Sequence, residues 1–228
     1  GKTNILEALS MLTPGRGLRG AKTHEMQKQP QQSPGQKPWS ISTVLKTTYT
    51  SERIGTGLDP ASDKRIVRIN GETRRAQSSL SEYLSCIWMT PQMDRLFLDA
   101  SRERRKFLDR LVFGFDPGHA GRLTRYENAM RQRAKILTET QAKGQAHDPQ
   151  WVSALESQMA ETGAAIAAAR LDFAQRLQES CKAQNQSAFP QARIFVKGTL
   201  EDMLQTSTAL EVEEFFLHQL AQSRGVDA

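Results

Sequence analysis

The first apolar pattern along the chain is that of a short helix. Within residues 4–12, the apolar positions at helical spacing are Ile5, Leu6, Leu9 and Leu12. A stretch rich in glycine and arginine, residues 14–20, then breaks the pattern, as glycine and proline commonly do. A glutamine- and proline-rich stretch over 26–38 carries few apolar residues and is typical of a loop. The sequence therefore predicts one helix followed by irregular chain.

A β-rich section comes next. Residues 39–49 place Trp, Ile, Thr, Leu, Thr and Tyr at every second position among mostly polar residues, and residues 54–58 repeat the alternation. Residues 64–69 predict a further strand. A period of two is typical of half-buried strands. Asn70-Gly71 favours a two-residue hairpin turn, because both residues tolerate a positive φ. The pattern predicts an antiparallel meander over about 39–75.

From Leu80 onward the pattern is helical almost throughout. Apolar residues recur every seven positions in two segments, which are separated by a polar break at 143–149: Leu123, Met130 and Leu137, then Val152, Met159, Ile166 and Phe173. Two matched segments joined by a short polar loop predict an antiparallel helical hairpin over about 120–180. We expect an extended arm, because a helix of about 20 residues spans about 30 Å. Two ordinary helices of a bundle are the alternative.

The last part of the chain carries two further patterns. Residues 192–199 predict a strand, and an acidic amphipathic helix is expected through Val212, Phe215, Phe216 and Leu220. With the earlier elements, these patterns suggest three parts. They are residues 1–115 with the first helix and the meander, residues 116–188 with the hairpin, and residues 189–228 as a segment that returns to the first part.

The charge of the chain is uneven. Lysine and arginine number 31 and acidic residues 25, which gives a net charge of +6. Residues 199–228 hold one basic and six acidic residues, a local charge of −5, so residues 1–198 carry +11. Such an excess attracts polyanions, above all nucleic acid. A solvated helical surface rich in arginine and lysine is the alternative.

Several classes of protein are excluded by what the sequence lacks. No run approaches 18 apolar residues, so we expect no membrane-spanning helix, and no secretory signal is visible. We therefore expect a cytoplasmic protein. Two cysteines, no CxxC, no HExxH and four scattered histidines argue against a metal centre or a disulfide framework. The four histidines are expected on the surface or in loops.

Gly1-Lys2-Thr3 leads directly into the first helix, as the end of a P-loop, G-x-x-x-x-G-K-[ST], does. In that motif the lysine contacts the β- and γ-phosphates and the threonine hydroxyl ligates Mg²⁺ at the positive end of the helix. The alternative is that Thr3 is a plain N-cap. The chain opens on glycine inside the motif, so we expect an internal fragment that lacks the start of the P-loop.

A second candidate site is a basic stretch after Thr90-Pro91-Gln92. Four cations occur within five residues: Arg102, Arg104, Arg105 and Lys106. Such a cluster could bind phosphate, or it could form a solvated face paired with Glu103 and Asp109. No grouping of Ser, His and Asp, reactive cysteine or paired carboxylates indicates hydrolytic chemistry.

Several segments can be compared with known proteins together. They are GKTNILEALSML, PGRGLRGA, WMTPQMDRLFLDASRERRKFLDRLV and LTRYENAMRQRAKIL, followed by FPQARIFVKGTLE. In this order they resemble the bacterial RecF family of DNA replication and repair proteins, which are ABC/SMC-like ATPases. The resemblance covers essentially the whole chain. It implies an α/β (α+β) fold, namely an ABC/SMC-type ATPase head fragment with an antiparallel β-meander and a helical coiled-coil arm.

The resemblance also implies site residues and cofactors. Gly1, Lys2 and Thr3 match the end of the P-loop, which binds ATP and Mg²⁺. Gln92 lies where ABC-type heads sense the γ-phosphate and hold the metal, although relatives often carry glutamate there. Arg16 and Arg19 match a basic segment of the family. Together with the four cations of the second candidate site, they are the expected DNA contacts.

Function and partners follow from the same resemblance. It implies an ATP-dependent homodimer that binds single- and double-stranded DNA, acts at gaps and junctions, and helps mediator proteins load a recombinase in replication, recombinational repair and the SOS response. The chain lacks the family's signature and Walker B residues, so residues 1–228 alone are not expected to be a competent ATPase. A helical-hairpin interaction module with an accidental Gly-Lys-Thr is the alternative.

Overall fold

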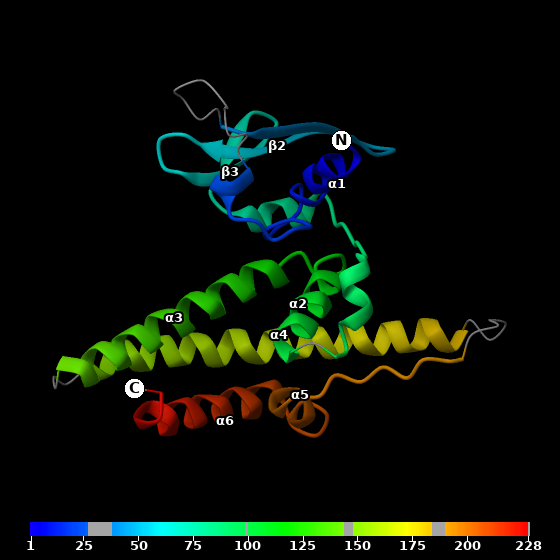
Figure 1. Ribbon diagram of the computed structural model, residues 1–228. Coiled ribbons are helices and arrows are strands. Elements are labelled where there is room, and N and C mark those ends of the chain that lie inside the picture. The colour runs from blue at the N-terminus through cyan, green and yellow to red at the C-terminus, as the bar shows by residue number, and fades with distance from the viewer. Residues whose placement is uncertain (27–37, 99, 144–147, 184–189, 228) are drawn as a thin grey trace. The chain divides into compact units, whose positions relative to one another are not determined.

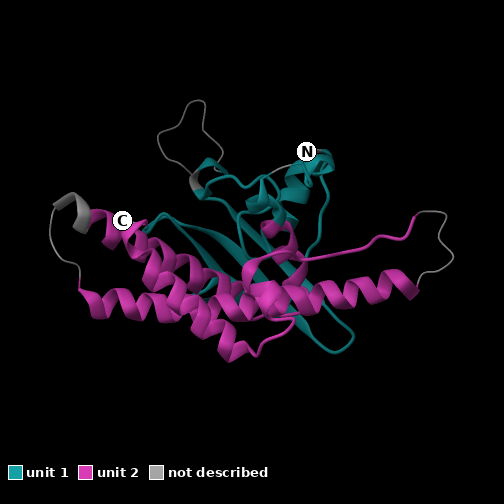
Figure 2. Ribbon diagram, turned by 90° about the horizontal axis from the view of Figure 1, so that it is seen from below, with its two compact units in different colours: residues 1–104 teal, residues 105–228 magenta. Residues whose placement is uncertain are grey.

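The computed structural model describes residues 1–26, 38–98, 100–143, 148–183 and 190–227. Contacts divide the chain into two compact units, residues 1–104 and 105–228 (Figure 2). The sequence suggested three parts, with divisions after residues 115 and 188. In the structure the helices that follow residue 198 share a unit with the hairpin helices.

The first unit combines one helix, short 3₁₀ turns and a four-stranded sheet. Its elements are α1 (Lys2–Ser10), η1 (Thr23–Met26), β1 (Ser40–Lys46), β2 (Ser51–Asp59), β3 (Lys64–Ile69), β4 (Glu72–Arg74), η2 (Gln77–Glu82) and η3 (Pro91–Arg95). The strands are antiparallel and lie in the order β1-β2-β3-β4 (Figure 1). The predicted meander is confirmed.

The turn and the core of this unit follow the pattern of the sequence. Asn70 and Gly71 join β3 to β4 with φ values of 52° and 89°, as a two-residue hairpin turn requires. The sheet buries one face in a core that also includes one residue from the turn after α1 and one from η2: Leu12, Ile54, Val67, Ile69 and Leu80.

The second unit is helical. It contains most of α2 (Ser101–Val112), which crosses the boundary between the units, together with α3 (His119–Lys143), α4 (Pro149–Ala183), α5 (Thr199–Met203), α6 (Ala209–Gln222) and η4 (Ser223–Gly225). α3 and α4 run antiparallel, so the predicted hairpin is confirmed (Figure 1). α6, the predicted acidic helix, packs along α4 as well. No helix in the described part of the chain is both long enough and apolar enough to cross a membrane.

The strand expected over 192–199 is absent. Residues 190–198 have no regular secondary structure, and α5 begins at Thr199. The side chain of Gln178 in α4 accepts a hydrogen bond from the Ile194 amide (2.8 Å) and donates one to the Ala192 carbonyl (3.3 Å). An amide side chain, rather than a neighbouring strand, therefore binds this segment, so its apolar alternation does not produce a strand.

The contact surface of α3 also differs from the expected one. Met130, placed on the heptad face, is 42 % exposed. Ala129, Arg133 and Leu137 are at most 4 % exposed and face the rest of the unit. These residues are spaced by four, so the buried stripe of α3 includes an arginine that a search for apolar heptads passes over.

Arg133 belongs to a buried ionic network that joins α3, α4 and the end of the second unit. Its Nε donates to Glu156 Oε1 (3.0 Å), and its other nitrogens donate to the Leu220 carbonyl and to Asp227 (both 2.7 Å). Arg224 donates to the same Glu156 carboxylate (Nε to Oε1, 2.9 Å). Burial would raise the pKa of Glu156, but the hydrogen bonds from Arg224 and Arg133 outweigh burial and lower it.

A second network joins α2, α3, α4 and α5. Asp109 accepts hydrogen bonds from Arg170 (2.7 and 2.9 Å) and pairs with His119 Nε2 (3.0 Å), while Arg170 also approaches Glu201 (3.5 Å). The expectation that all four histidines lie at the surface is wrong for His119, which is fully buried. The reason is this carboxylate partner, together with the ring of Phe113 (centroids 5.8 Å apart).

The two buried carboxylates make the stability of the second unit dependent on pH. Burial opposes ionisation of Asp109, but hydrogen bonds from His119 and Arg170 hold its pKa below the ordinary value, as happens at Glu156. A lowered pKa in the folded state adds stability above the pKa of the unfolded chain, and this stability is lost as pH falls through the folded value. We therefore expect the free energy of unfolding to be steady from pH 7 to about 5 and to fall below about pH 4.

Denaturant titrations of the protein over pH 3–7 check this expectation. Asp109→Asn should be less stable than the wild type at pH 7 and should lose less further stability on acidification, because one carboxylate no longer titrates. An equal acid loss in both proteins would contradict the assignment of the effect to Asp109.

Candidate functional site

The start of α1 presents the three residues that match the end of a P-loop. Gly1 is the N-cap of the helix, and no side chain forms a capping hydrogen bond. The alternative, in which Thr3 is the N-cap, is therefore wrong. Gly1, Lys2 and Thr3 are exposed, and a Cβ built on Gly1 meets no atom within 4 Å. The positive end of a helix, with an ammonium group and a hydroxyl beside it, is suited to a phosphate and its metal ion.

α1 buries polar residues and leaves its apolar residues exposed, the reverse of what its sequence pattern predicts. Its apolar residues Ile5, Leu6 and Leu9 are 64 %, 57 % and 48 % exposed among the described residues. The buried residues of the helix are Glu7 and Ser10. Buried polar groups need hydrogen-bonding partners, and both residues find them in the glycine- and arginine-rich segment that follows.

That segment, residues 14–20, is called the basic loop below, and it folds back onto α1. Ser10 Oγ accepts a hydrogen bond from the Leu18 amide (2.7 Å), and Glu7 accepts one from the Arg19 amide (3.1 Å). Gly17 has a φ of +70°, and a Cβ there would lie 2.6 Å from Met11 Sδ and 2.8 Å from Glu7 Oε1. Only glycine permits both the backbone conformation and the close approach.

The two arginines of the basic loop have different surroundings. Arg19 is exposed and approaches the Glu7 carboxylate at 3.9 Å. Arg16 is exposed, and no ion pair of its guanidinium is seen within the described residues. Of the two guanidinium groups, that of Arg16 is therefore the better placed to bind an external anion.

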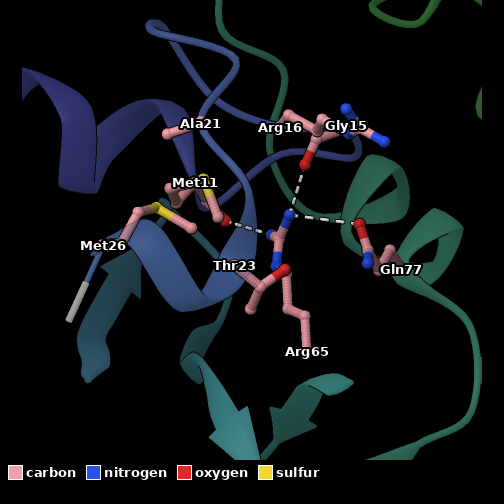
Figure 3. A pocket seen from close by; sticks show the side chains of 8 residues that line it. All are labelled: Met11, Gly15, Arg16, Ala21, Thr23, Met26, Arg65 and Gln77. Carbon is pink, nitrogen blue, oxygen red and sulfur yellow. Dashed lines mark hydrogen bonds between the residues drawn. The ribbon is translucent and has the colours of Figure 1, made fainter. Parts of the chain in front are cut away.

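Arg65 of β3 anchors the start of the basic loop. Its Nη atoms donate to the carbonyls of Met11, Thr13 and Gly15 and to the side chain of Gln77 (3.1 Å). Figure 3 shows the guanidinium beside Met11, Gly15 and Gln77, and Arg65 and Arg16 both line a cavity of about 250 Å³. Burial lowers the pKa of Arg65 to about 10, and the group remains a cation at neutral pH.

The remaining expected residues lie on other elements. Arg102, Arg104, Arg105 and Lys106 are exposed on α2. At 100° per residue, Arg102, Arg105 and Lys106 share one face of the helix, while Arg104 lies on another. The backbone of Gln92 lies in η3, and its side chain lies outside what the structure describes.

The structure thus brings together three sets of the expected residues. Gly1, Lys2 and Thr3 share the start of α1, Arg16 and Arg19 share the basic loop packed on that helix, and four cations share α2. No group of three His, Cys, Asp or Glu residues within the described ranges could hold a metal ion. Thr3 and Gln92 stay the predicted metal ligands, on the basis of the P-loop match and the family resemblance. Sequence reasoning missed Glu7, Ser10 and Arg65. Glu7 and Ser10 lie on the predicted helix, but its apolar pattern suggested that Ile5, Leu6 and Leu9 would be the buried residues.

The sequence is similar to RecF proteins over its whole length. No protein-family model matches the sequence. The chain is 41 % identical over 230 residues to the DNA replication and repair protein RecF of Mesorhizobium japonicum, and 38 % identical over 236 residues to that of Caulobacter sp. strain K31. Both alignments cover the whole chain and 58–60 % of the relative. The chain therefore spans about three fifths of the length of the curated relatives it matches.

Solved structures agree on the fold. A structure described as the recombination mediator protein RecF-ATPrS in the RecFOR pathway superposes with a TM-score of 0.80 at 19 % identity, covering 99 % of this chain and 59 % of that one. A second structure, described as RecF-ATP, superposes with a TM-score of 0.71 at 18 % identity. The mixed fold of helices and antiparallel strands expected from the sequence is confirmed.

Proposed function

We propose that this chain, which is homologous to RecF proteins along its whole length, is part of an ATP-dependent DNA-binding protein that acts in DNA replication and recombinational repair. The observation that carries the proposal is Gly1-Lys2-Thr3, exposed at the start of α1 in a chain with these relatives. The relatives favour this function over a helical-hairpin interaction module with an accidental Gly-Lys-Thr.

The nucleotide would bind at the start of α1. Lys2 would contact the β- and γ-phosphates, the amides of the first helical turn would add hydrogen bonds, and the Thr3 hydroxyl would ligate Mg²⁺. Bound Mg²⁺ would neutralise phosphate charge. Gln92 is proposed as a further contact to the γ-phosphate and the metal, on the basis of its position in the sequence.

DNA would bind through exposed cations on two elements. These are Arg16 and Arg19 of the basic loop, and Arg102, Arg104, Arg105 and Lys106 of α2. The net charge of +11 over residues 1–198 supports this assignment. Contacts of this kind run to phosphates, so binding should depend little on base sequence and strongly on salt.

We also propose the partners of this protein from its similarity to RecF proteins. The protein would form an ATP-dependent homodimer in the cytoplasm and would act with recombination mediator proteins at single- and double-stranded DNA during the SOS response. The description of one matching structure as a recombination mediator of the RecFOR pathway supports the mediator partners.

The α2 surface gives a direct test of DNA binding. For about 4 to 6 phosphate contacts, the slope of log affinity against log salt should be roughly −4 to −5. Neutralising two cations on one face of α2, as Arg102→Gln/Arg105→Gln, should weaken binding similarly on different sequences and should flatten the slope by up to about 2. Salt titrations of the intact protein with duplex and gapped DNA measure both quantities.

The matched control removes the same charge elsewhere. Arg125 and Arg131 are exposed on α3, and Arg125→Gln/Arg131→Gln should leave the slope close to that of the wild type. Unchanged DNA binding with a lower melting temperature in the α2 variant would instead show that these arginines stabilise the fold, and the DNA assignment of α2 would fail.

A further inference from the structure

Arg65 and Arg16 line the same cavity and have opposite surroundings. Arg65 is half-buried on β3, whereas Arg16 is exposed on the basic loop. The cavity of about 250 Å³ is also lined by Met11, Met26 and Thr23 (Figure 3). Two arginines that line one cavity suggest an anion, and the hydrogen bonds decide which of the two guanidinium groups can bind it.

All five N–H groups of Arg65 already have acceptors. Nε donates to Thr56 Oγ1 (2.8 Å), and the four Nη hydrogens are used by the carbonyls of Met11, Thr13 and Gly15 and by Gln77. None of these acceptors is charged. Since a guanidinium has five donors and no more, Arg65 cannot bind a ligand without giving up a contact to the chain.

Three side chains together fix the basic loop. Arg65 binds the carbonyls that lead into it, while Ser10 and Glu7 bind the amides of its second half. Arg16 lies between these two sets of contacts, directly after Gly15. Its backbone is therefore held from both sides, and a loop that is already ordered loses less entropy when one of its side chains binds a ligand.

We infer that Arg65 is a positioning residue: it holds the basic loop so that the guanidinium of Arg16 can bind a phosphate group. This inference rests on the proposed function, which supplies two sources of phosphate, the DNA backbone and ATP. α1 has nine residues and is about 13 Å long, so the cavity near its last turn is well separated from Lys2 and Thr3.

The test is a double-mutant cycle on the intact protein, with duplex DNA and Mg-ATP titrated separately. Arg65→Lys keeps the charge but cannot reach five acceptors. With Arg16 present it should weaken binding of one of the two ligands about tenfold, the loss expected for one charge-assisted hydrogen bond. In an Arg16→Gln background the same change should have little further effect, because its target is gone. The ligand that shows this behaviour is the phosphate source.

Two controls keep the cycle decisive. Arg68→Lys changes an exposed arginine on the same strand and should leave both affinities unchanged. If Arg65→Lys fails to fold, Gln77→Ala removes one contact of the guanidinium, and the cycle is repeated with it, with an expected loss of about threefold.

The outcomes separate the inference from the proposed function. Equal losses with and without Arg16, for both ligands, would mean that Arg65 acts through general stability, and the inference would be overturned while wild-type binding stays intact. A wild-type protein that binds neither DNA nor ATP would overturn both.

Discussion

Replacing Lys2 with alanine should weaken the binding of Mg-ATP by the intact protein about 10- to 100-fold. The lysine is exposed at the positive end of α1, where its ammonium group would face the β- and γ-phosphates. A hydrogen bond to a charged group contributes about 1.5–3 kcal/mol, which corresponds to this range of affinity. Equilibrium titration with ATP measures the change.

Two further variants make the result specific. Lys46→Ala removes an exposed lysine at the end of β1 in the same unit and should leave the ATP affinity unchanged. Thr3→Ala should bind ATP without Mg²⁺ as the wild type does and should gain less from added Mg²⁺. Wild-type affinity in both Lys2→Ala and Thr3→Ala would remove the P-loop assignment.

Elements with a strong local pattern could be predicted from the sequence. The turn at Asn70-Gly71 was predictable because few other dipeptides adopt two successive positive φ values. The hairpin of α3 and α4 was predictable because apolar residues recur every seven positions in two segments on either side of a short polar break. Local pattern failed over 192–199, where the partner of the extended chain proved to be the Gln178 side chain.

Buried charges could not be predicted in the same way. His119 is buried because Asp109 lies ten residues earlier on another helix, and Arg133 is buried because Glu156 and Asp227 reach it from distant parts of the chain. A pattern that counts charged residues as exposed misses each of these side chains. Burial of a charge is decided by its partners, and the partners meet only in the folded unit.

The same reason explains what was missed at the candidate site. The match to a basic segment of the RecF family suggested Arg16 as a DNA contact, but the residues that hold its loop are Glu7, Ser10 and Arg65. Arg65 is about 50 positions away along the chain, on a strand. Charged residues are common on the exposed face of a strand, so the pattern of the sequence did not indicate that Arg65 binds the loop. Arg16, the proposed phosphate contact, could be identified from the sequence, but the residues that hold its loop could not.

The largest loss of stability is expected at Glu156. Its side chain is 1 % exposed and accepts hydrogen bonds from two arginines, of which Arg133 is 5 % exposed. Without Glu156, Arg224 loses its carboxylate partner and Arg133 keeps only Asp227, which is 42 % exposed. Breaking a buried pair of this kind costs about 3–5 kcal/mol. Glu156→Gln should therefore lower the free energy of unfolding of the second unit by about this amount, measured by denaturant titration at pH 7.

The control and the second variant decide what the loss means. Glu161 is exposed on the same helix, and Glu161→Gln should change stability by less than about 0.5 kcal/mol. Arg224→Gln in the Glu156→Gln background should cost less than Arg224→Gln alone, because the carboxylate that Arg224 binds is already absent. Since these contacts bind the end of α6 and η4 to α3 and α4, the loss should appear as earlier release of residues 209–227 in hydrogen exchange. Equal costs of Glu156→Gln and Glu161→Gln would show that the network is solvated and does not hold the C-terminal helix to the hairpin.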